Sequence, residues 1–219
     1  MNHIKIIVLI LFLIIFCYKF YFQTFRSYYV NLKLKRGGDP EMFLYELEKD
    51  ITKAKSDEYR RSLLVNKVSG LFYMGKWEEC IDLLDRIGSN FDNEIYTVVY
   101  YVNYITVCIF LGNIDTAKRL YLDNKELFEK YKTVSRYKDV TESLKKIEGI
   151  FCFYDNDLNR SKSIFEELLD KQKSSIYNAI NHYFLGKILE KEGSFTESKI
   201  HFNKAKALGN KTFLSNQLS

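Results

Sequence analysis

Cysteine and histidine are the residue types in this chain that could bind a metal or perform nucleophilic chemistry, but their spacing does not favour either. The 219 residues include four Cys and three His. A structural zinc site needs clustered ligands such as C-x-x-C, whereas Cys80, Cys108 and Cys152 are far apart in the chain. We therefore predict no bound metal. We expect these thiols to fill apolar positions, as free cysteines do in protein cores.

Motifs of known enzyme active sites are missing from the sequence. It contains no Gly-rich phosphate loop and no nucleophile motif. His182 and His201 are nineteen residues apart, on two different predicted helices. Histidine at a seam between helices is usually a structural residue. We predict that the protein is not an enzyme and has no cofactor; the alternative is an enzyme or ligand sensor with a pocket between repeated units.

A short sequence pattern occurs four times in the chain, and it predicts the helices that position the side chains. Each copy has a turn residue, four mostly polar residues, a small residue, and a large apolar residue four positions later. The turn and small residues are Gly75 and Cys80, Gly112 and Ala117, Asn156 and Ser161, and Gly193 and Ser198. The turn residues are 37, 44 and 37 positions apart. Gly and Asn suit the positive φ at a helix end, and a small residue lets two antiparallel helices approach closely. This spacing predicts an all-α stack of about four helical hairpins.

These hairpins resemble tetratricopeptide repeats, whose pattern includes L-G-x2-Y followed by A-x3-F. The fourth unit matches best, through Leu185-Gly186, Ser198 and Phe202. No unit has the opening Trp or the closing Pro of the family, and the 44-residue step requires a longer second helix or loop around residues 120–137. The resemblance covers about residues 60–210, so we assign residues 59–219 to the repeat domain. No polar helix that could cap the last repeat is evident after residue 210.

The resemblance implies a superhelix whose first helices line a concave groove. The usual groove positions correspond to Val65, Asn66, Phe72, Tyr73, Val102, Asn103, Ile109, Phe110, Ile150, Phe153 and Tyr154. Most of these residues are apolar, and large apolar patches tend to mark interaction sites. Amides at Asn66 and Asn103 could bond to an extended peptide backbone. The set predicts an interaction scaffold or adaptor that binds a peptide or helix; packing between neighbouring helices is the other interpretation of its phenylalanines.

Ahead of the repeats, the N-terminus is strongly apolar. Residues 6–16 are eleven consecutive apolar residues, which contribute about −3 to −7 kcal/mol to membrane insertion. The run is short enough for a signal peptide, but no small-x-small cleavage site follows it. We therefore predict a transmembrane anchor over residues 1–25. Residues 26–58 are then a basic and aromatic juxtamembrane segment with a degenerate leading repeat, whose helix starts at Asp39-Pro40.

The positive charge of the chain is concentrated beside this apolar run. Residues 1–36 contain six Lys or Arg and no acidic residue, which leaves 27 basic and 28 acidic residues in the remainder. The predicted membrane-interface residues are Lys19, Tyr21, Arg26, Lys33, Lys35 and Arg36. This distribution favours a lipid bilayer as partner and argues against nucleic acid. It predicts a single-pass protein of the cell membrane with a cytoplasmic repeat domain; a domain on the other side of the membrane is the alternative.

Overall fold

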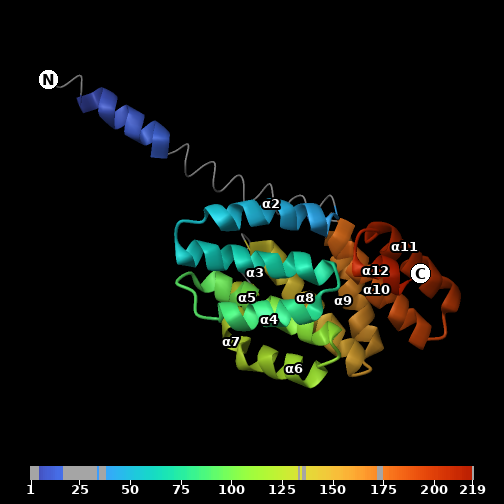
Figure 1. Cartoon of the computed structure of the whole chain (residues 1–219). Coiled ribbons are helices and arrows are strands. Elements are labelled where there is room, and N and C mark those ends of the chain that lie inside the picture. The colour runs from blue at the N-terminus through green and yellow to red at the C-terminus, as the bar shows by residue number, and fades with distance from the viewer. Residues whose placement is uncertain are drawn as a thin grey trace.

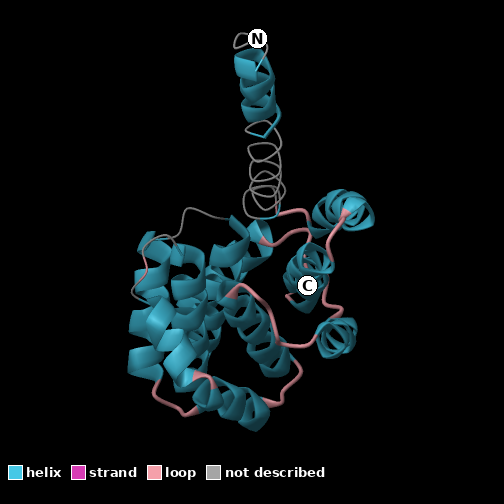
Figure 2. Cartoon of the chain, turned by 90° about the vertical axis from the view of Figure 1, so that its left-hand side faces the viewer, coloured by secondary structure: helices cyan, strands magenta, loops and turns pink. Residues whose placement is uncertain are grey.

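The computed structural model describes residues 5–16, 34, 38–132, 134, 137–171 and 175–218, and the secondary structure in this part of the chain is helical (Figures 1 and 2). No strand occurs among these residues. The all-α prediction is confirmed.

Antiparallel helix pairs make up most of the described fold. The first helices of the pairs are α3 (Asp57–Tyr73), α5 (Glu94–Phe110), α8 (Lys138–Tyr154) and α10 (Ser175–Lys191), each of 17 residues. Their partners are α4 (Trp77–Ile87), α6 (Ile114–Asp123), α9 (Leu158–Lys171) and α11 (Phe195–Leu208). Successive pairs contact one another through α3 and α5, α5 and α8, and α9 and α10. The pairs therefore stack in chain order.

Each of the four predicted turns has the same backbone geometry. The φ angles are 77° at Gly75, 82° at Gly112, 62° at Asn156 and 79° at Gly193. In the first turn, Gly75 N donates to Phe72 O at 2.9 Å and Lys76 N donates to Leu71 O at 3.0 Å. The other three turns repeat these two bonds. This is the Schellman arrangement, which satisfies the last carbonyls of the first helix in each pair.

The predicted small residues lie where the two helices of a pair come closest. Cys80, Ala117 and Ser161 are 0% exposed. Ser161 Oγ donates to Gly149 O at 2.8 Å, and Ser198 Oγ makes the equivalent bond to Gly186 O at 2.9 Å. These bonds join the second helix of a pair to a carbonyl of the first, so a larger side chain at these positions would separate the two helices.

The longer middle step has a structural explanation. Helix α6 ends at Asp123, and the chain continues as a second short helix, α7 (Lys125–Lys132), which contacts α8. Phe128 of α7 is fully buried. The sequence predicted a longer second helix or loop around residues 120–137; the structure places a separate short helix there instead.

The N-terminal part of the chain is only partly described. Residues 5–16 form a helix that stands apart from the other helices in both views (Figures 1 and 2), and its apolar side chains from Ile6 to Phe16 are 50–66% exposed. Among the described residues, no helix is both long enough and apolar enough to cross a membrane. The rest of the predicted span, and Lys19, Tyr21, Arg26, Lys33, Lys35 and Arg36, lie outside the described residues.

The predicted leading repeat is described in its second half. Helix α2 (Pro40–Lys53) begins at the expected cap, where Asp39 Oδ1 accepts a hydrogen bond from Met42 N at 3.0 Å. It packs against α3 through a buried face that includes Phe43 and Leu47. Within residues 26–36, which precede this helix in the predicted juxtamembrane segment, only Leu34 is described.

The two ends of the helical stack meet. Helix α12 (Phe213–Gln217) follows α11 and buries Phe213, whose ring centroid lies 5.6 Å from that of Phe72 and 5.3 Å from those of Trp77 and Phe110. Lys211 Nζ pairs with Asp39 Oδ2 at 2.6 Å. The C-terminal segment therefore covers the C-terminal ends of α3 and α5 and contacts the start of α2.

Candidate binding cleft between the helical units

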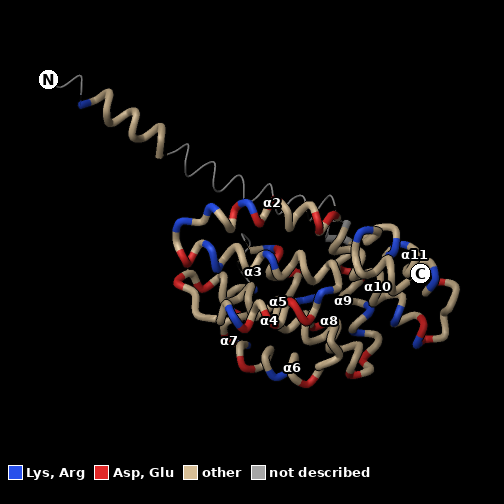
Figure 3. The backbone as a smooth tube through the Cα atoms, viewed as in Figure 1, with Lys and Arg blue, Asp and Glu red and all other residues tan. Residues whose placement is uncertain are grey.

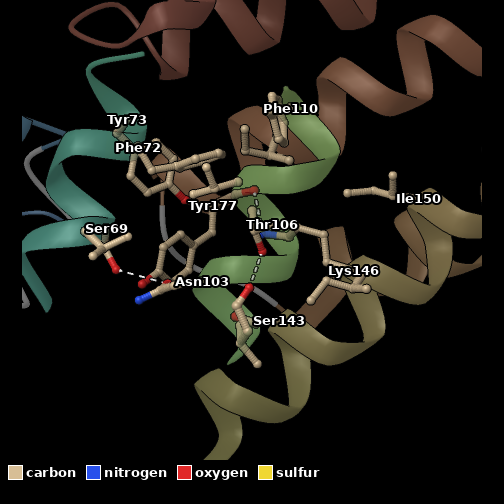
Figure 4. A pocket seen from close by; sticks show the side chains of 15 residues that line it. Ser69, Phe72, Tyr73, Asn103, Thr106, Phe110, Ser143, Lys146, Ile150 and Tyr177 are labelled. Carbon is tan, nitrogen blue, oxygen red and sulfur yellow. Dashed lines mark hydrogen bonds between the residues drawn. The ribbon is translucent and has the colours of Figure 1, made fainter. Parts of the chain in front are cut away.

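The first helices of the four pairs enclose a cavity of about 90 Å³. Its walls come from α3, α5, α8 and α10, with Phe72, Phe110 and Ile150 among the apolar members (Figure 4). Its polar members include Ser69, Asn103, Thr106, Ser143 and Lys146. These four helices belong to four different pairs, so the cavity exists only because the pairs stack.

A second cavity of about 380 Å³ adjoins the first. The two share five wall residues, namely Ser69, Val102, Asn103, Ser143 and Tyr177. The larger cavity adds Leu34, Asn66, Ile95 and Val99, together with residues 137–140 at the start of α8. We call the two cavities together the inner cleft. Its volume falls within the range of small ligand sites and is sufficient for a few inserted side chains.

The predicted groove residues are divided between the inner cleft and other environments. Phe72, Tyr73, Val102, Asn103, Phe110 and Ile150 line the smaller cavity, and Asn66 lines the larger one. Val65 and Ile109 are buried, at 0% and 2% exposure, and line neither cavity. Phe153 is also buried and lines neither cavity, whereas Tyr154 is 46% exposed. The predicted set contained adjacent pairs, and adjacent residues on a helix point in different directions. In two of these pairs, Phe72 with Tyr73 and Val102 with Asn103, both members nevertheless line the smaller cavity. Of the pairs Val65–Asn66 and Ile109–Phe110, only the second member lines the inner cleft.

Asn103 is engaged within the protein. Its Nδ2 donates to Val65 O at 3.1 Å, and Ser69 Oγ donates to its Oδ1 at 3.5 Å (Figure 4). The amide therefore links α5 to α3. The bond to a peptide backbone that the sequence suggested for Asn103 would have to replace these contacts.

Lys146 is the main cleft residue that the sequence analysis missed. It is the only charged residue among those that line the smaller cavity. Its side chain extends from α8 towards Thr106 and Tyr177 (Figure 4), and Nζ donates to Tyr177 O at 3.5 Å. Burial lowers the pKa of Lys146 to about 8, against an opposing effect of Glu142. The sequence feature that could have identified Lys146 is its spacing: it follows Ser143 by three residues and precedes Ile150 by four, which places all three on one face of the helix.

The histidines come together away from the inner cleft. Nδ1 of His182 and Nδ1 of His201 are 3.0 Å apart across the seam between α10 and α11. Burial lowers the pKa of His182 and, together with the neighbouring His201 and Lys204, brings it to about 4. In the described part of the chain, no three or more His, Cys, Asp or Glu side chains converge in a way that could hold a metal.

The described cysteines are free thiols in apolar surroundings. Cys80 and Cys108 are buried, and Cys152 is partly buried. Burial raises the pKa of Cys80 to about 12 and that of Cys108 to about 11. Because the thiolate is the reactive form, these two thiols are unreactive at neutral pH. This agrees with their expected role as small core residues.

Comparison with known proteins identified no relative. No family model matches the chain, and no match was found among curated proteins or among solved structures. The likeness to tetratricopeptide repeats therefore depends on the residues and the helix pairs described above.

Proposed function

We propose that this protein is a membrane-tethered interaction scaffold that binds a peptide or helix of a partner protein in the inner cleft. In this proposal the helical pairs form a tetratricopeptide-like superhelix. The observation that carries the proposal is the inner cleft itself, which is formed by the first helices of four successive pairs.

The chemistry of the inner cleft supports a protein partner. Aromatic and aliphatic side chains such as Phe72, Val99 and Phe110 would receive apolar side chains of the partner. Asn66, Ser69 and Ser143 supply polar groups beside them. A mostly apolar concave surface with a few polar groups is typical of binding sites.

The N-terminal apolar run supports the membrane tether. Its eleven side chains from Ile6 to Phe16 are at least half exposed. The rest of the domain carries Lys, Arg, Asp and Glu interspersed along its helices, whereas the N-terminal helix is uncharged after Lys5 (Figure 3). Exposed apolar surface of this kind favours a lipid environment. In the proposal, the repeat domain lies on the cytoplasmic side of the cell membrane.

Site-specific photo-crosslinking tests the partner site. Substituting Phe72 or Phe153 by alanine would also weaken the core, because both are buried. A photoreactive residue at Asn66, in the wall of the larger cavity, avoids that problem. The matched control places the same group at Leu122 of α6, which is 65% exposed and lies outside both cavities. We expect a partner adduct from position 66 and none from position 122. Adducts of one partner in equal yield at both positions would contradict binding in the cleft.

A flotation experiment tests the tether separately. The full chain, mixed with lipid vesicles, should float with them in a density gradient. Placing two charges in the apolar run, Leu11→Asp with Phe12→Asp, costs several kcal/mol of insertion free energy and should leave the protein in the dense fraction. The control changes Met42 and Tyr45, exposed residues of α2, to Asp. Flotation of the Leu11→Asp/Phe12→Asp chain would rule out this tether.

A further inference from the structure

The smaller cavity combines an apolar body with one cationic end. Val68, Phe72, Val107, Phe110, Ile147 and Ile150 supply aliphatic and aromatic walls. Lys146 is the charged group, and none of the wall residues is Asp or Glu. The cavity volume of about 90 Å³ holds roughly six to nine water-sized groups at 10–15 Å³ each. A ligand of this size would be a short organic molecule.

Lys146 has hydrogen-bonding capacity that the described protein does not use. An ammonium group has three N–H donors, and within the described residues Nζ makes one hydrogen bond, to Tyr177 O at the long distance of 3.5 Å. The Tyr177 ring centroid lies 5.1 Å away. Glu142, one turn earlier on α8, pairs with Lys138 at 3.5 Å. A charged group away from water is costly without a partner, so an anion at Nζ would be stabilising.

The threonine and serine hydroxyls of α5 and α8 in the cavity wall donate to carbonyls of their own helices, so Lys146 is the group that attracts an anion. Thr106 Oγ1 donates its proton to Val102 O at 2.7 Å, which leaves lone pairs rather than a donor on that oxygen. Ser143 Oγ likewise donates its proton within α8, to Asp139 O at 2.8 Å. Lys146 therefore supplies the charge-assisted hydrogen bond, and its single positive charge matches the single negative charge of a carboxylate.

We propose that the smaller cavity binds a short organic monocarboxylate, with its carboxylate on Lys146 Nζ and its apolar body against Phe72, Phe110 and Ile150. The ligand enters from the larger cavity, with which the site shares five wall residues. The ligand would lie against Phe72 and Phe110, which the proposed partner also contacts, so ligand and partner side chains would compete for the smaller cavity. The ligand proposal does not depend on that partner.

Trp77 provides a direct readout of occupancy. It is the one tryptophan of the chain, and its ring lies 5.7 Å from that of Phe110. The full chain in detergent is titrated with hexanoate, and with hexan-1-ol as an uncharged control, while Trp77 fluorescence is recorded. We expect a saturable change with hexanoate and a much weaker one with hexan-1-ol. An equal response to both compounds, or no saturable response to hexanoate, would overturn the proposal.

A pair of neighbouring lysines separates charge recognition from loss of fold. Lys146→Met keeps the length of the side chain and removes the charge, and we expect it to bind hexanoate at least tenfold more weakly, because a charge-assisted bond is lost. Lys145→Met is the matched control, since Lys145 Nζ pairs with the Glu167 carboxylate and lies outside the cavity walls. Its affinity should stay within about twofold of the parent chain. Unchanged affinity in a folded Lys146→Met chain would refute the assignment.

The pH dependence gives an independent check. Because the pKa of Lys146 is lowered to about 8 by burial, the empty site loses its positive charge as the pH rises through that value. Hexanoate affinity of the parent chain should therefore fall between pH 7 and pH 9. The affinity of the Lys145→Met chain should fall in the same way. A pH-independent affinity would contradict recognition by the ammonium group.

Discussion

His182 and His201 form a contact that allows at most one proton between the two facing nitrogens. Nδ1 of one ring lies 3.0 Å from Nδ1 of the other, so protonating both rings would bring two positive charges together. Burial comes first among the causes that lower the pKa of His182, and it also lowers that of His201, where Lys204 acts in the same direction. The folded state therefore favours neutral rings.

This preference predicts a loss of stability in acid. The pKa of His182 is about 4 in the folded chain, below the ordinary histidine pKa of 6.5. The unfolded chain therefore binds more protons as the pH falls below about 6.5, and the free energy of unfolding decreases down to about pH 4. With an allowance for partial solvent exposure, we expect a loss of roughly 1–2 kcal/mol.

Urea unfolding at pH 7 and pH 4.5, followed by circular dichroism, measures the effect. The chain with His182→Gln and His201→Gln should lose less stability over this interval than the parent chain. The same loss in both chains would assign the acid sensitivity to other groups.

At the scale of elements, the four turns show how one backbone conformation is encoded by different residues. The first, second and fourth turns have Gly, and the third turn has Asn156, which adopts φ 62°. Asn tolerates this left-handed region better than other residues with a Cβ, and β-branched residues tolerate it poorly. The side-chain space at these turns is open at Gly112 and Gly193, where a Cβ would meet no heavy atom within 4 Å. Backbone conformation, rather than packing, therefore selects the residue at these two turns.

Substitutions at Gly112 test this explanation. Gly112→Asn should reduce the free energy of unfolding by less than about 1 kcal/mol, whereas Gly112→Val should cost roughly 1 kcal/mol more than Asn does. Thermal or urea unfolding of the two variants measures the difference. Equal losses for Asn and Val would mean that the turn changes its conformation on substitution.

At the scale of the whole molecule, closure of the stack by α12 combines aromatic packing with one ion pair. Phe213 is 6% exposed and contacts Phe72, Trp77 and Phe110. The pair of Lys211 with Asp39 lies at the surface, where the lysine side chain is 58% exposed. The hydrogen bond that Lys211 donates to the Asp39 carboxylate lowers the pKa of Asp39. Buried aromatic area contributes more free energy than an exposed ion pair does.

Phe213→Ala should therefore lower the free energy of unfolding by about 2–4 kcal/mol, and Lys211→Ala by less than about 1 kcal/mol. Urea unfolding of both variants beside the parent chain gives the comparison. If Lys211→Ala lowered the free energy of unfolding as much as Phe213→Ala does, the ion pair would stabilise the closed stack as much as the aromatic packing does, which would contradict this explanation.

Features that depend on nearby residues were predictable from the sequence. The turn at Gly75 needs a residue that accepts positive φ. Ser161 needs to be small because it contacts Gly149, twelve residues earlier in the same helical pair. The α2 start is equally local, since Asp39 caps Met42 N three residues away. The inner cleft was predicted in part, because Phe72 and Phe110 were expected on the concave side but the directions of their neighbours on each helix were not resolved.

The sequence by itself determined the all-α class, the four turns, the small contact residues and the apolar character of the N-terminal run, because each is set by local periodicity or by the conformational limits of one residue. Only the tertiary structure decided that Lys146 faces a cavity enclosed by four helices, that His182 meets His201, and that Phe213 closes over Phe72 and Phe110. These contacts join side chains from separate helices. Their existence depends on the angles at which the helical pairs stack, and no short stretch of sequence encodes those angles.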